Sequence, residues 1–268
     1  MKAAATRVPV LMYHRVGQAA NEWEAKYCVG PERFASHMWA LKRRGMHACS
    51  VEDFVAWLDS QRGLPDGSFV LTFDDGFLDV YQHAYPILLE LGWPATVFLV
   101  SSLVGREDEW CRSENPGGHT YPLMGRVQID EMMRNGFSFH SHSRSHSDLT
   151  NLPHDTLAEE LAGSRRELED LLGCAVPFFA YPYGRHNANV LAMTRAAGYQ
   201  AAFSVQPGFN RHDVDRYRIR RLDVFGTDTA RALLRKVSFG TNDGSMRHLI
   251  RYYVDRVAVR MGVAKEPR

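Results

Sequence analysis

The chain has 268 residues, 45% of them hydrophobic, which is enough to bury the core of one enzyme-sized domain. Its formal charge is +1, from 32 basic and 31 acidic residues, so the composition predicts neither a nucleic-acid partner nor a general attraction to anionic membranes. The four cysteines lie far apart without a CxxC pair, which argues against a disulfide framework.

The first residues lack the pattern of a secretory signal. Arg7 and His14 interrupt the first apolar stretch, which therefore falls short of the roughly 7–15 apolar residues of a signal core. No stretch of the chain approaches the ~20 apolar residues that span a bilayer. We therefore expect a cytoplasmic protein without a transmembrane segment; an exported protein trimmed of its signal would show the same sequence.

Short apolar runs alternate with longer amphipathic stretches along the chain. The runs predict strands at residues 8–13, 69–73, 95–100, 137–141, 178–181 and 201–205. The stretches predict helices at residues 31–44, 51–61, 81–91, 155–172 and 189–197, several of them followed by a glycine that ends the helix. This alternation predicts a parallel α/β fold, either an open sheet or a barrel.

Two segments stand outside this alternation. Residues 105–126 are polar and rich in Gly and Pro, and we expect an excursion from the scaffold that borders a site. The pattern from residue 246 onward is that of a basic amphipathic helix, which predicts a surface helix or, as the alternative, a contact with a membrane surface. We therefore expect one domain over residues 1–268, with a core of about 8–225 and a helical tail of about 228–262.

No phosphate-binding glycine motif follows any predicted strand, so a nucleotide-binding sheet is disfavoured. The sequence TFDDG instead places Asp74 and Asp75 at the end of the predicted strand 69–73. Adjacent carboxylates repel each other and resist burial, so this arrangement costs stability unless a cation or a shared proton offsets the repulsion.

Histidines gather in the sequence HSHSRSH at residues 140–146, directly after another predicted strand. Two imidazoles and one carboxylate suit Zn²⁺ or another transition metal and leave coordination positions open, and His142 and His146 are the predicted pair. Residues four apart lie ~13 Å apart in an extended strand, so the chain must form a helical turn or a tight loop here. Parallel strands end on one face, which would bring the histidines to the Asp-Asp pair.

This placement explains the two adjacent carboxylates. One aspartate would bind the cation, while its neighbour stays ionised and can take a proton from water. A further turn, YPYG, follows the predicted strand 178–181. Its Gly184 would let the backbone approach a ligand, with a main-chain N–H directed into the site as an oxyanion donor.

TFDDG, HSRSH and FAYPYG, in this order, resemble the polysaccharide deacetylases of carbohydrate esterase family 4 over roughly residues 9–223. The opening VPVLMYHRVG is similar to the start of the poly-N-acetylglucosamine deacetylase branch. The resemblance implies a distorted (β/α)7 barrel in which Asp75, His142 and His146 hold Zn²⁺ or another divalent ion. It also implies Asp74 as the general base and the main-chain N–H of Tyr183 as a donor to the oxyanion.

The sequence departs from the family pattern at two points. Ala180 stands where many members carry the arginine that orients the base, and the candidates for that role are Arg185, Arg220 and Arg221. The family's fifth motif, which carries the histidine that acts as general acid, has no convincing match.

Two histidines are candidates for this general acid: His14, at the end of the first predicted strand, and His248 in the tail. Its position at a strand end favours His14, and a structural histidine bonded to the backbone is the alternative. If neither serves, the proton would come from water or return from Asp74.

The leading hypothesis is therefore a metal-dependent hydrolase that removes N-acetyl groups from N-acetylhexosamine units of a glycan or glycoconjugate. An amidohydrolase that opens a small cyclic amide is a second hypothesis, because the same fold and ion would serve it. A sugar-binding module without turnover is a third. The third is disfavoured because a module without its cation has no need for a repelling Asp-Asp pair.

Overall fold

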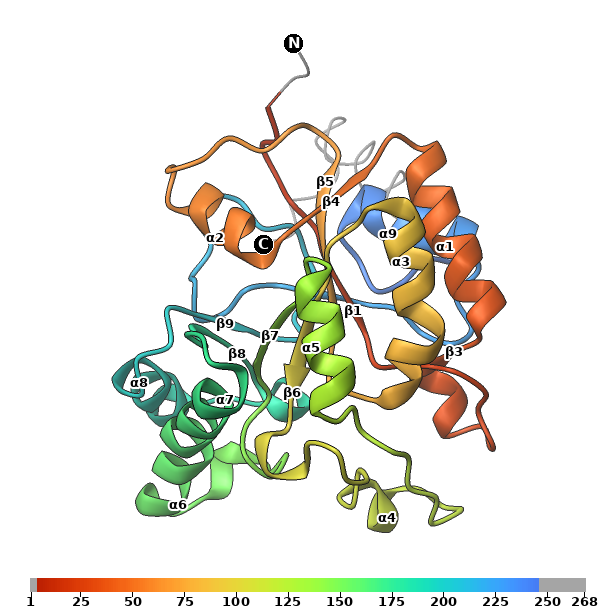
Figure 1. Cartoon of the computed structure of the whole chain (residues 1–268). Coiled ribbons are helices and arrows are strands. Elements are labelled where there is room, and N and C mark those ends of the chain that lie inside the picture. The colour runs from red at the N-terminus through yellow and green to blue at the C-terminus, as the bar shows by residue number, and fades with distance from the viewer. Residues whose placement is uncertain (1–3, 246–268) are drawn as a thin grey trace, which may run out of the picture.

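The computed structural model describes residues 4–245, in which a curled sheet of eight parallel strands is surrounded by helices (Figure 1). The strand order is β10-β1-β5-β6-β7-β8-β9, and β4 pairs with the first half of β5. The strands of the sheet are β1 (Val10–Tyr13), β4 (His47–Cys49), β5 (Ser68–Phe73), β6 (Thr96–Leu99), β7 (Ser138–Ser141), β8 (Phe178–Ala180), β9 (Ala201–Phe203) and β10 (Leu222–Asp223). A separate parallel pair is formed by β2 (Arg15–Val16) and β3 (Cys28–Val29).

Helices connect successive strands and cover the outside of the curl (Figure 1). They are α1 (Pro31–Arg43), α2 (Val51–Leu58), α3 (Tyr85–Leu91), α4 (Cys111–Glu114), α5 (Arg126–Arg134), α6 (His154–Ala158), α7 (Ser164–Leu172), α8 (Ala188–Ala196) and α9 (Ala230–Phe239). One π-helical turn, η2 (Val80–Ala84), leads into α3, and another, η5 (Glu159–Gly163), joins α6 to α7. Single 3₁₀ turns are η1 (Glu24–Lys26), η3 (Ser101–Leu103), η4 (Leu149–Asn151) and η6 (Pro182–Gly184).

All six predicted strands are confirmed, as are the five helices predicted between residues 31 and 197. The sequence reading missed β2, β3, β4, β10, α4 and α5. β4 is three half-buried residues without an apolar run, and β10 is only two residues long. In α5 only Ile129 and Met132 are buried, so the apolar face of this nine-residue helix is small.

Residues 219–223 close the curl into a distorted barrel. Ile219 bridges to Phe203 of β9, and Leu222 pairs with Leu11 of β1. The chain just before β10 therefore lies between the two edges of the sheet. This position explains how Arg221, which directly precedes β10, reaches the centre of the barrel with none of its side chain exposed.

Two hydrophobic layers hold the barrel. The larger packs the sheet against the outer helices, and a smaller cluster combines inward-facing strand residues such as Val70, Phe98 and Phe178 with Phe54 and Trp57 of α2. Figure 1 shows α2 at the end where the strands begin and α4 beyond the opposite end. Apolar packing thus closes one end of the barrel, and the loops after the strands shape the other.

The predicted excursion at residues 105–126 lies at that second end and contains the short helix α4 (Figure 1). Of the predicted tail, α9 packs against α1. The amphipathic pattern from residue 246, including His248, lies outside the described residues. Among residues 4–245, none of the helices combines the length and the apolar character that crossing a bilayer requires.

Candidate metal centre and active-site pocket

Asp74 and Asp75 directly follow β5, at the end of the barrel bordered by the long loops. Asp75 adopts a left-handed backbone conformation (φ 73°), as does Gly76 (φ 82°). A Cβ on residue 76 would lie 2.6 Å from the Leu99 side chain, so both the conformation and the space require glycine. The turn sends the adjacent carboxylates to different partners: Asp74 to Arg221, and Asp75 to the histidines.

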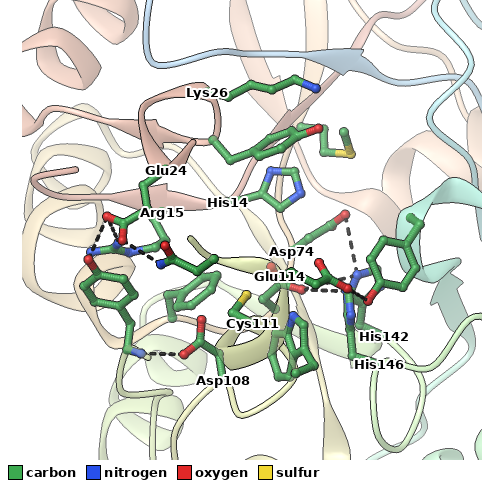
Figure 2. Close-up of a pocket in the computed structure, with 18 of the residues that line it drawn as sticks. His14, Arg15, Glu24, Lys26, Asp74, Asp108, Cys111, Glu114, His142 and His146 are labelled. Carbon is green, nitrogen blue, oxygen red and sulfur yellow. Dashed lines mark hydrogen bonds and ion pairs between the residues drawn. The ribbon is translucent and has the colours of Figure 1, made fainter. Parts of the chain in front are cut away.

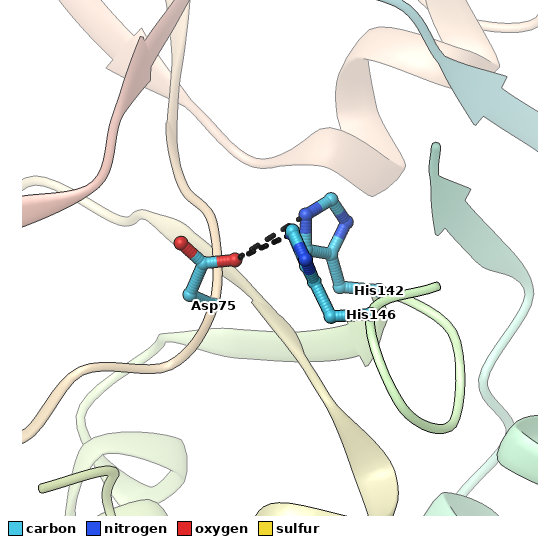
Figure 3. A group of neighbouring side chains, drawn as sticks. All are labelled: Asp75, His142 and His146. Carbon is cyan, nitrogen blue, oxygen red and sulfur yellow. Dashed lines mark ion pairs between the residues drawn. The ribbon is translucent and has the colours of Figure 1, made fainter. Parts of the chain in front are cut away.

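His142 and His146 lie on the loop that follows β7. Ser143 (φ 67°) and His146 (φ 62°) are both left-handed, and the Ser143 hydroxyl accepts the main-chain N–H of His146 at 3.0 Å. The chain therefore forms a tight loop here, not a helical turn. It brings the Nε2 atoms of His142 and His146 to 3.4 and 3.3 Å from Oδ1 of Asp75 (Figure 3). All three side chains are buried, and their donor atoms lie within 4.8 Å of one another.

The hydrogen bonds around these residues show that the cluster fits a cation. Nδ1 of His142 donates to the carbonyl of Ala180 at 2.8 Å, and burial lowers the pKa of His142 to about 4, so Nε2 carries a lone pair at neutral pH. This lone pair faces Oδ1 of Asp75, which is buried and has no hydrogen-bond partner among residues 4–245. Two acceptors at this distance repel each other, whereas a divalent ion between them would bind both.

Asp74 is paired with Arg221 inside the barrel. Nη1 and Nη2 of Arg221 donate to the two carboxylate oxygens at 2.6 and 2.8 Å, and its Nε donates to the carbonyl of Ser204 at 2.9 Å. Burial alone would raise the pKa of Asp74, but the charge of Arg221 outweighs it and holds this pKa below its ordinary value. Asp74 is thus an ionised carboxylate 3.9 Å from Nε2 of His142.

Arg221 therefore supplies the guanidinium that the third motif lacks. Ala180, at the motif position, is fully buried at the end of β8. The other two candidates are exposed and lie elsewhere: Arg185 pairs with Asp148, and Arg220 donates to a main-chain carbonyl. Arg220 and Arg221 are adjacent in the sequence. Only the path of the backbone that closes the barrel determines that Arg221 points inward and Arg220 outward.

His14 follows β1 and lines the same pocket, near Asp74 (Figure 2). Its ring packs against Tyr27, with the ring centroids 5.0 Å apart. Its Nδ1 atom is buried and makes no hydrogen bond to any residue that the structure describes. Nδ1 of His14 therefore does not make the hydrogen bond to the backbone that the alternative, a structural histidine, would require.

Tyr183 and Trp110 enclose the imidazole of His146. Trp110 stacks on it at a centroid distance of 4.6 Å, and Tyr183 meets it edge-on at 4.7 Å. Tyr183 is left-handed (φ 56°), and its hydroxyl donates to Glu114 at 2.7 Å. Gly184 lines the pocket with a left-handed backbone (φ 67°), and a Cβ there would lie 2.2 Å from Val205, so packing within the chain by itself requires glycine.

Glu24 joins the two loops that wall the pocket, a cavity of about 490 Å³. Its carboxylate accepts the main-chain N–H of Ala20 at 2.7 Å. Across the pocket wall it also accepts hydrogen bonds from Asn115 and Tyr121, both at 2.7 Å, and lies 3.1 Å from Nδ1 of His119. Burial alone would raise the pKa of Glu24, but these hydrogen bonds outweigh it and lower the pKa to about 2.

We expect Glu24→Gln to destabilise the protein in a pH-dependent way. The pKa of Glu24 is about 2 in the folded protein against an ordinary 4.5, so its ionisation stabilises the fold fully above pH 4.5 and progressively less toward pH 2. The difference in free energy of unfolding between wild type and Glu24→Gln, measured by urea denaturation, should shrink over that range. Glu22→Gln, at an exposed position of the same loop, is the control. A difference that does not change with pH would contradict this role of Glu24.

Among the pocket residues that sequence reasoning missed, three make notable contacts: Glu24, Arg15 and Asp108. Glu24 gives no local signal, because the partners that it contacts across the pocket wall lie more than 90 positions away. Arg15 stacks on Tyr121 with its guanidinium carbon 3.2 Å from the ring centroid. Asp108 is 1% exposed, and burial raises its pKa to about 6. Each depends on contacts between distant loops that a motif does not record.

Residues 61–202, more than half of the chain, match the profile of a protein family described as polysaccharide deacetylase. The chain belongs to the polysaccharide deacetylase family. Family membership indicates a hydrolase that removes acetyl groups from a carbohydrate. The matched residues include Asp74, Asp75 and both histidines of the cluster, whereas His14 and Arg221 lie outside them.

Relatives and solved structures agree with this membership. The poly-β-1,6-N-acetyl-D-glucosamine N-deacetylase of Staphylococcus epidermidis is 27% identical over 210 residues, which are 74% of this chain and 68% of that protein. The Streptococcus pyogenes deacetylase PplD, solved with acetate, has a TM-score of 0.74 at 24% identity and covers 86% of this chain and 98% of its own. IcaB from Ammonifex degensii has a TM-score of 0.70 at 26% identity, over 82% of this chain and 92% of its own. The predicted distorted (β/α)7 barrel, in a single domain, is confirmed.

Proposed function

We propose that this deacetylase is a divalent-metal-dependent enzyme that removes N-acetyl groups from N-acetylglucosamine units of a polysaccharide, with Zn²⁺ as its ion. The proposal rests on one observation: the adjacent carboxylates of Asp74 and Asp75, on one turn, have different surroundings. Asp75 faces the imidazoles of His142 and His146 without a hydrogen-bond donor from the described residues, and Asp74 is held ionised by Arg221.

Asp75, His142 and His146 would hold the ion. One carboxylate and two imidazoles form a donor set that suits Zn²⁺ and leaves positions open for water and substrate. A bound divalent ion supplies Lewis acidity, which polarises an amide carbonyl and makes a nearby water more acidic.

The residues around the cluster would transfer the protons and stabilise the oxyanion. Asp74 takes a proton from the water that attacks the acetamide carbon, and Arg221 keeps its carboxylate oriented and ionised. The main-chain N–H of Tyr183 donates to the carbonyl oxygen as negative charge develops on it. His14 donates a proton to the sugar nitrogen as the C–N bond breaks, so that the products are acetate and a free amine.

Poly-N-acetylglucosamine is the proposed substrate class because the Staphylococcus epidermidis relative is named for that polymer. The pocket, at about 490 Å³, falls within the roughly 300–1,000 Å³ of small-ligand sites and admits part of a glycan chain. Acetate release should therefore be measured on β-1,6-linked N-acetylglucosamine oligomers and on a small cyclic amide. Activity on the cyclic amide alone, or sugar binding without acetate release, would replace this proposal with one of the two alternatives.

Asp74→Asn should retain the metal and lose turnover. Removing a general base typically costs about 10²–10⁴-fold in rate, and we expect kcat for acetate release to fall by that factor. The variant leaves the charge of Arg221 without its partner, so folding is checked by circular dichroism and metal content by elemental analysis. A folded, metal-loaded Asp74→Asn with full activity would refute the assignment of Asp74 as the base.

A further inference from the structure

The loop between the two histidines is held from outside the pocket by a buried carboxylate. Glu160 is 6% exposed and lies in the π-helical turn η5 between α6 and α7. One of its oxygens accepts the main-chain N–H groups of Arg144 and Ser145, both at 2.9 Å. Its other oxygen accepts the hydroxyl of Ser145. Glu160 thus binds the middle of the loop through three hydrogen bonds.

These bonds act where the loop backbone is most strained. Arg144 and Ser145 stand between the left-handed residues Ser143 and His146, and a left-handed residue other than glycine costs about 1–3 kcal/mol. Such a conformation persists only where surrounding contacts determine it. The main-chain N–H groups that Glu160 binds belong to the two residues that connect the left-handed positions, so its carboxylate stabilises the loop shape that brings the imidazoles together.

Glu160 lies in the fold where it can hold the loop without contacting a ligand in the pocket. Within the part of the chain that the structure describes, Glu160 is not among the residues that line the pocket. It comes from a π-helical turn, a feature that is often found near functional sites. Its neighbour Glu159 lies in the same turn with an exposed side chain that pairs with Arg166. Of the two, Glu160 is the one that accepts hydrogen bonds from the loop, whereas Glu159 acts on it only through its charge on the exposed Arg144 side chain.

We propose that Glu160 is a positioning residue that sets the metal affinity of the cluster formed by Asp75, His142 and His146. The proposal rests on the metal binding proposed above. Residues that orient ligands without touching the ion typically change metal affinity 10–100-fold when removed. Without its carboxylate, the loop would sample other conformations, and the two imidazoles would no longer be held together.

The test measures metal affinity in the full chain, not activity. Wild type and variants are stripped with a chelator and titrated with Zn²⁺ in competition with a chromophoric chelator. We expect Glu160→Ala to weaken Zn²⁺ binding by about 10–100-fold. Glu160→Gln should recover most of the affinity, because its amide oxygen can accept both N–H groups and its NH₂ can donate to Ser145.

Two further measurements separate positioning from a general effect on folding. Glu159→Ala is the matched control and should bind Zn²⁺ within about twofold of wild type, since its exposed carboxylate pairs with Arg166 and meets the loop only through the charge of the exposed Arg144 side chain. The absorption spectrum of bound Co²⁺ should change in Glu160→Ala and not in Glu159→Ala, because it reports the ligand geometry. A residue that only stabilised the fold would lower the thermal stability of the metal-free protein and leave both readouts unchanged.

A folded Glu160→Ala variant with wild-type Zn²⁺ affinity and Co²⁺ spectrum would overturn the role of Glu160. If Glu160→Ala does not fold, Glu160→Asp is the variant that tests the proposal. Its shorter side chain keeps the charge but cannot reach all three hydrogen-bond donors. Unchanged affinity in Glu160→Asp would then overturn the proposal, and a loss of about fivefold or more would support it. Wild type that binds neither Zn²⁺ nor Co²⁺ would overturn the proposed function itself.

Discussion

Arg221→Met is expected to lower the free energy of unfolding by about 3–5 kcal/mol, because it leaves a buried carboxylate without its cation. The side chains of Arg221 and Asp74 are 0% and 3% exposed, so solvent cannot replace the lost charge. Urea denaturation measures the loss. Arg220→Met is the matched control, since the adjacent side chain is exposed, and its effect should stay within about 0.5 kcal/mol.

A double variant tests whether the pair itself is the cause. Asp74→Asn together with Arg221→Met removes both charges, so it should be less destabilised than the sum of the two single variants. Arg221→Met should also raise the pKa of Asp74, since burial would then be opposed only by His142 and His14, and move the acidic limb of the kcat/KM profile to higher pH. Additive effects on stability, with an unmoved acidic limb, would contradict the assigned pairing.

Asp75→Ala is expected to abolish Zn²⁺ binding and acetate release together. Asp75 supplies the only carboxylate of the cluster, and the neutral imidazoles that remain would hold a divalent ion far more weakly. Elemental analysis after dialysis should find no Zn²⁺ in the variant, and its activity should equal that of wild type treated with chelator.

Asp108→Asn is the matched control for metal content. It changes another buried carboxylate of the same pocket, one that lies outside the cluster. Asp108→Asn should therefore keep its Zn²⁺. An Asp75→Ala variant that retains Zn²⁺ at the wild-type level would show that the ion is bound elsewhere.

Much of the fold could be predicted because its parallel strands are continuous apolar runs. β5 is buried at all six of its positions, and β6 at all four, so their apolar runs and the flanking glycines were sufficient to predict these strands. β10 could not be predicted this way, because two residues carry no periodicity. Its place follows from pairing with β1, more than 200 positions earlier in the chain.

The candidate site was likewise predictable in part. The ends of β5 and β7 placed Asp75 near His142, because parallel strands end on one face. The separation of the three donor atoms depends on left-handed residues such as Ser143 and His146, which no propensity predicts. The partner of Asp74, Arg221, lies 147 positions away and could be narrowed only to three arginines.

The bound ion, its three ligands and the base role of Asp74 stay predictions, and three further points do so as well. The general acid role of His14 and the oxyanion role of Tyr183 concern chemistry, and both follow from position alone. The predicted cytoplasmic location concerns the cell. Measurements of the solvent isotope effect and the pH–rate profile on His14→Gln would address the first of them, with loss of the basic limb as the expected result.

The central claim is that Asp75, His142 and His146 hold one divalent ion on which deacetylation depends. The most direct test removes metal from wild type with a chelator and measures acetate release from N-acetylglucosamine oligomers as Zn²⁺ is added back. Release should be absent from the stripped protein and should rise until one Zn²⁺ is bound per chain. Undiminished release from protein shown to be free of metal would contradict the claim.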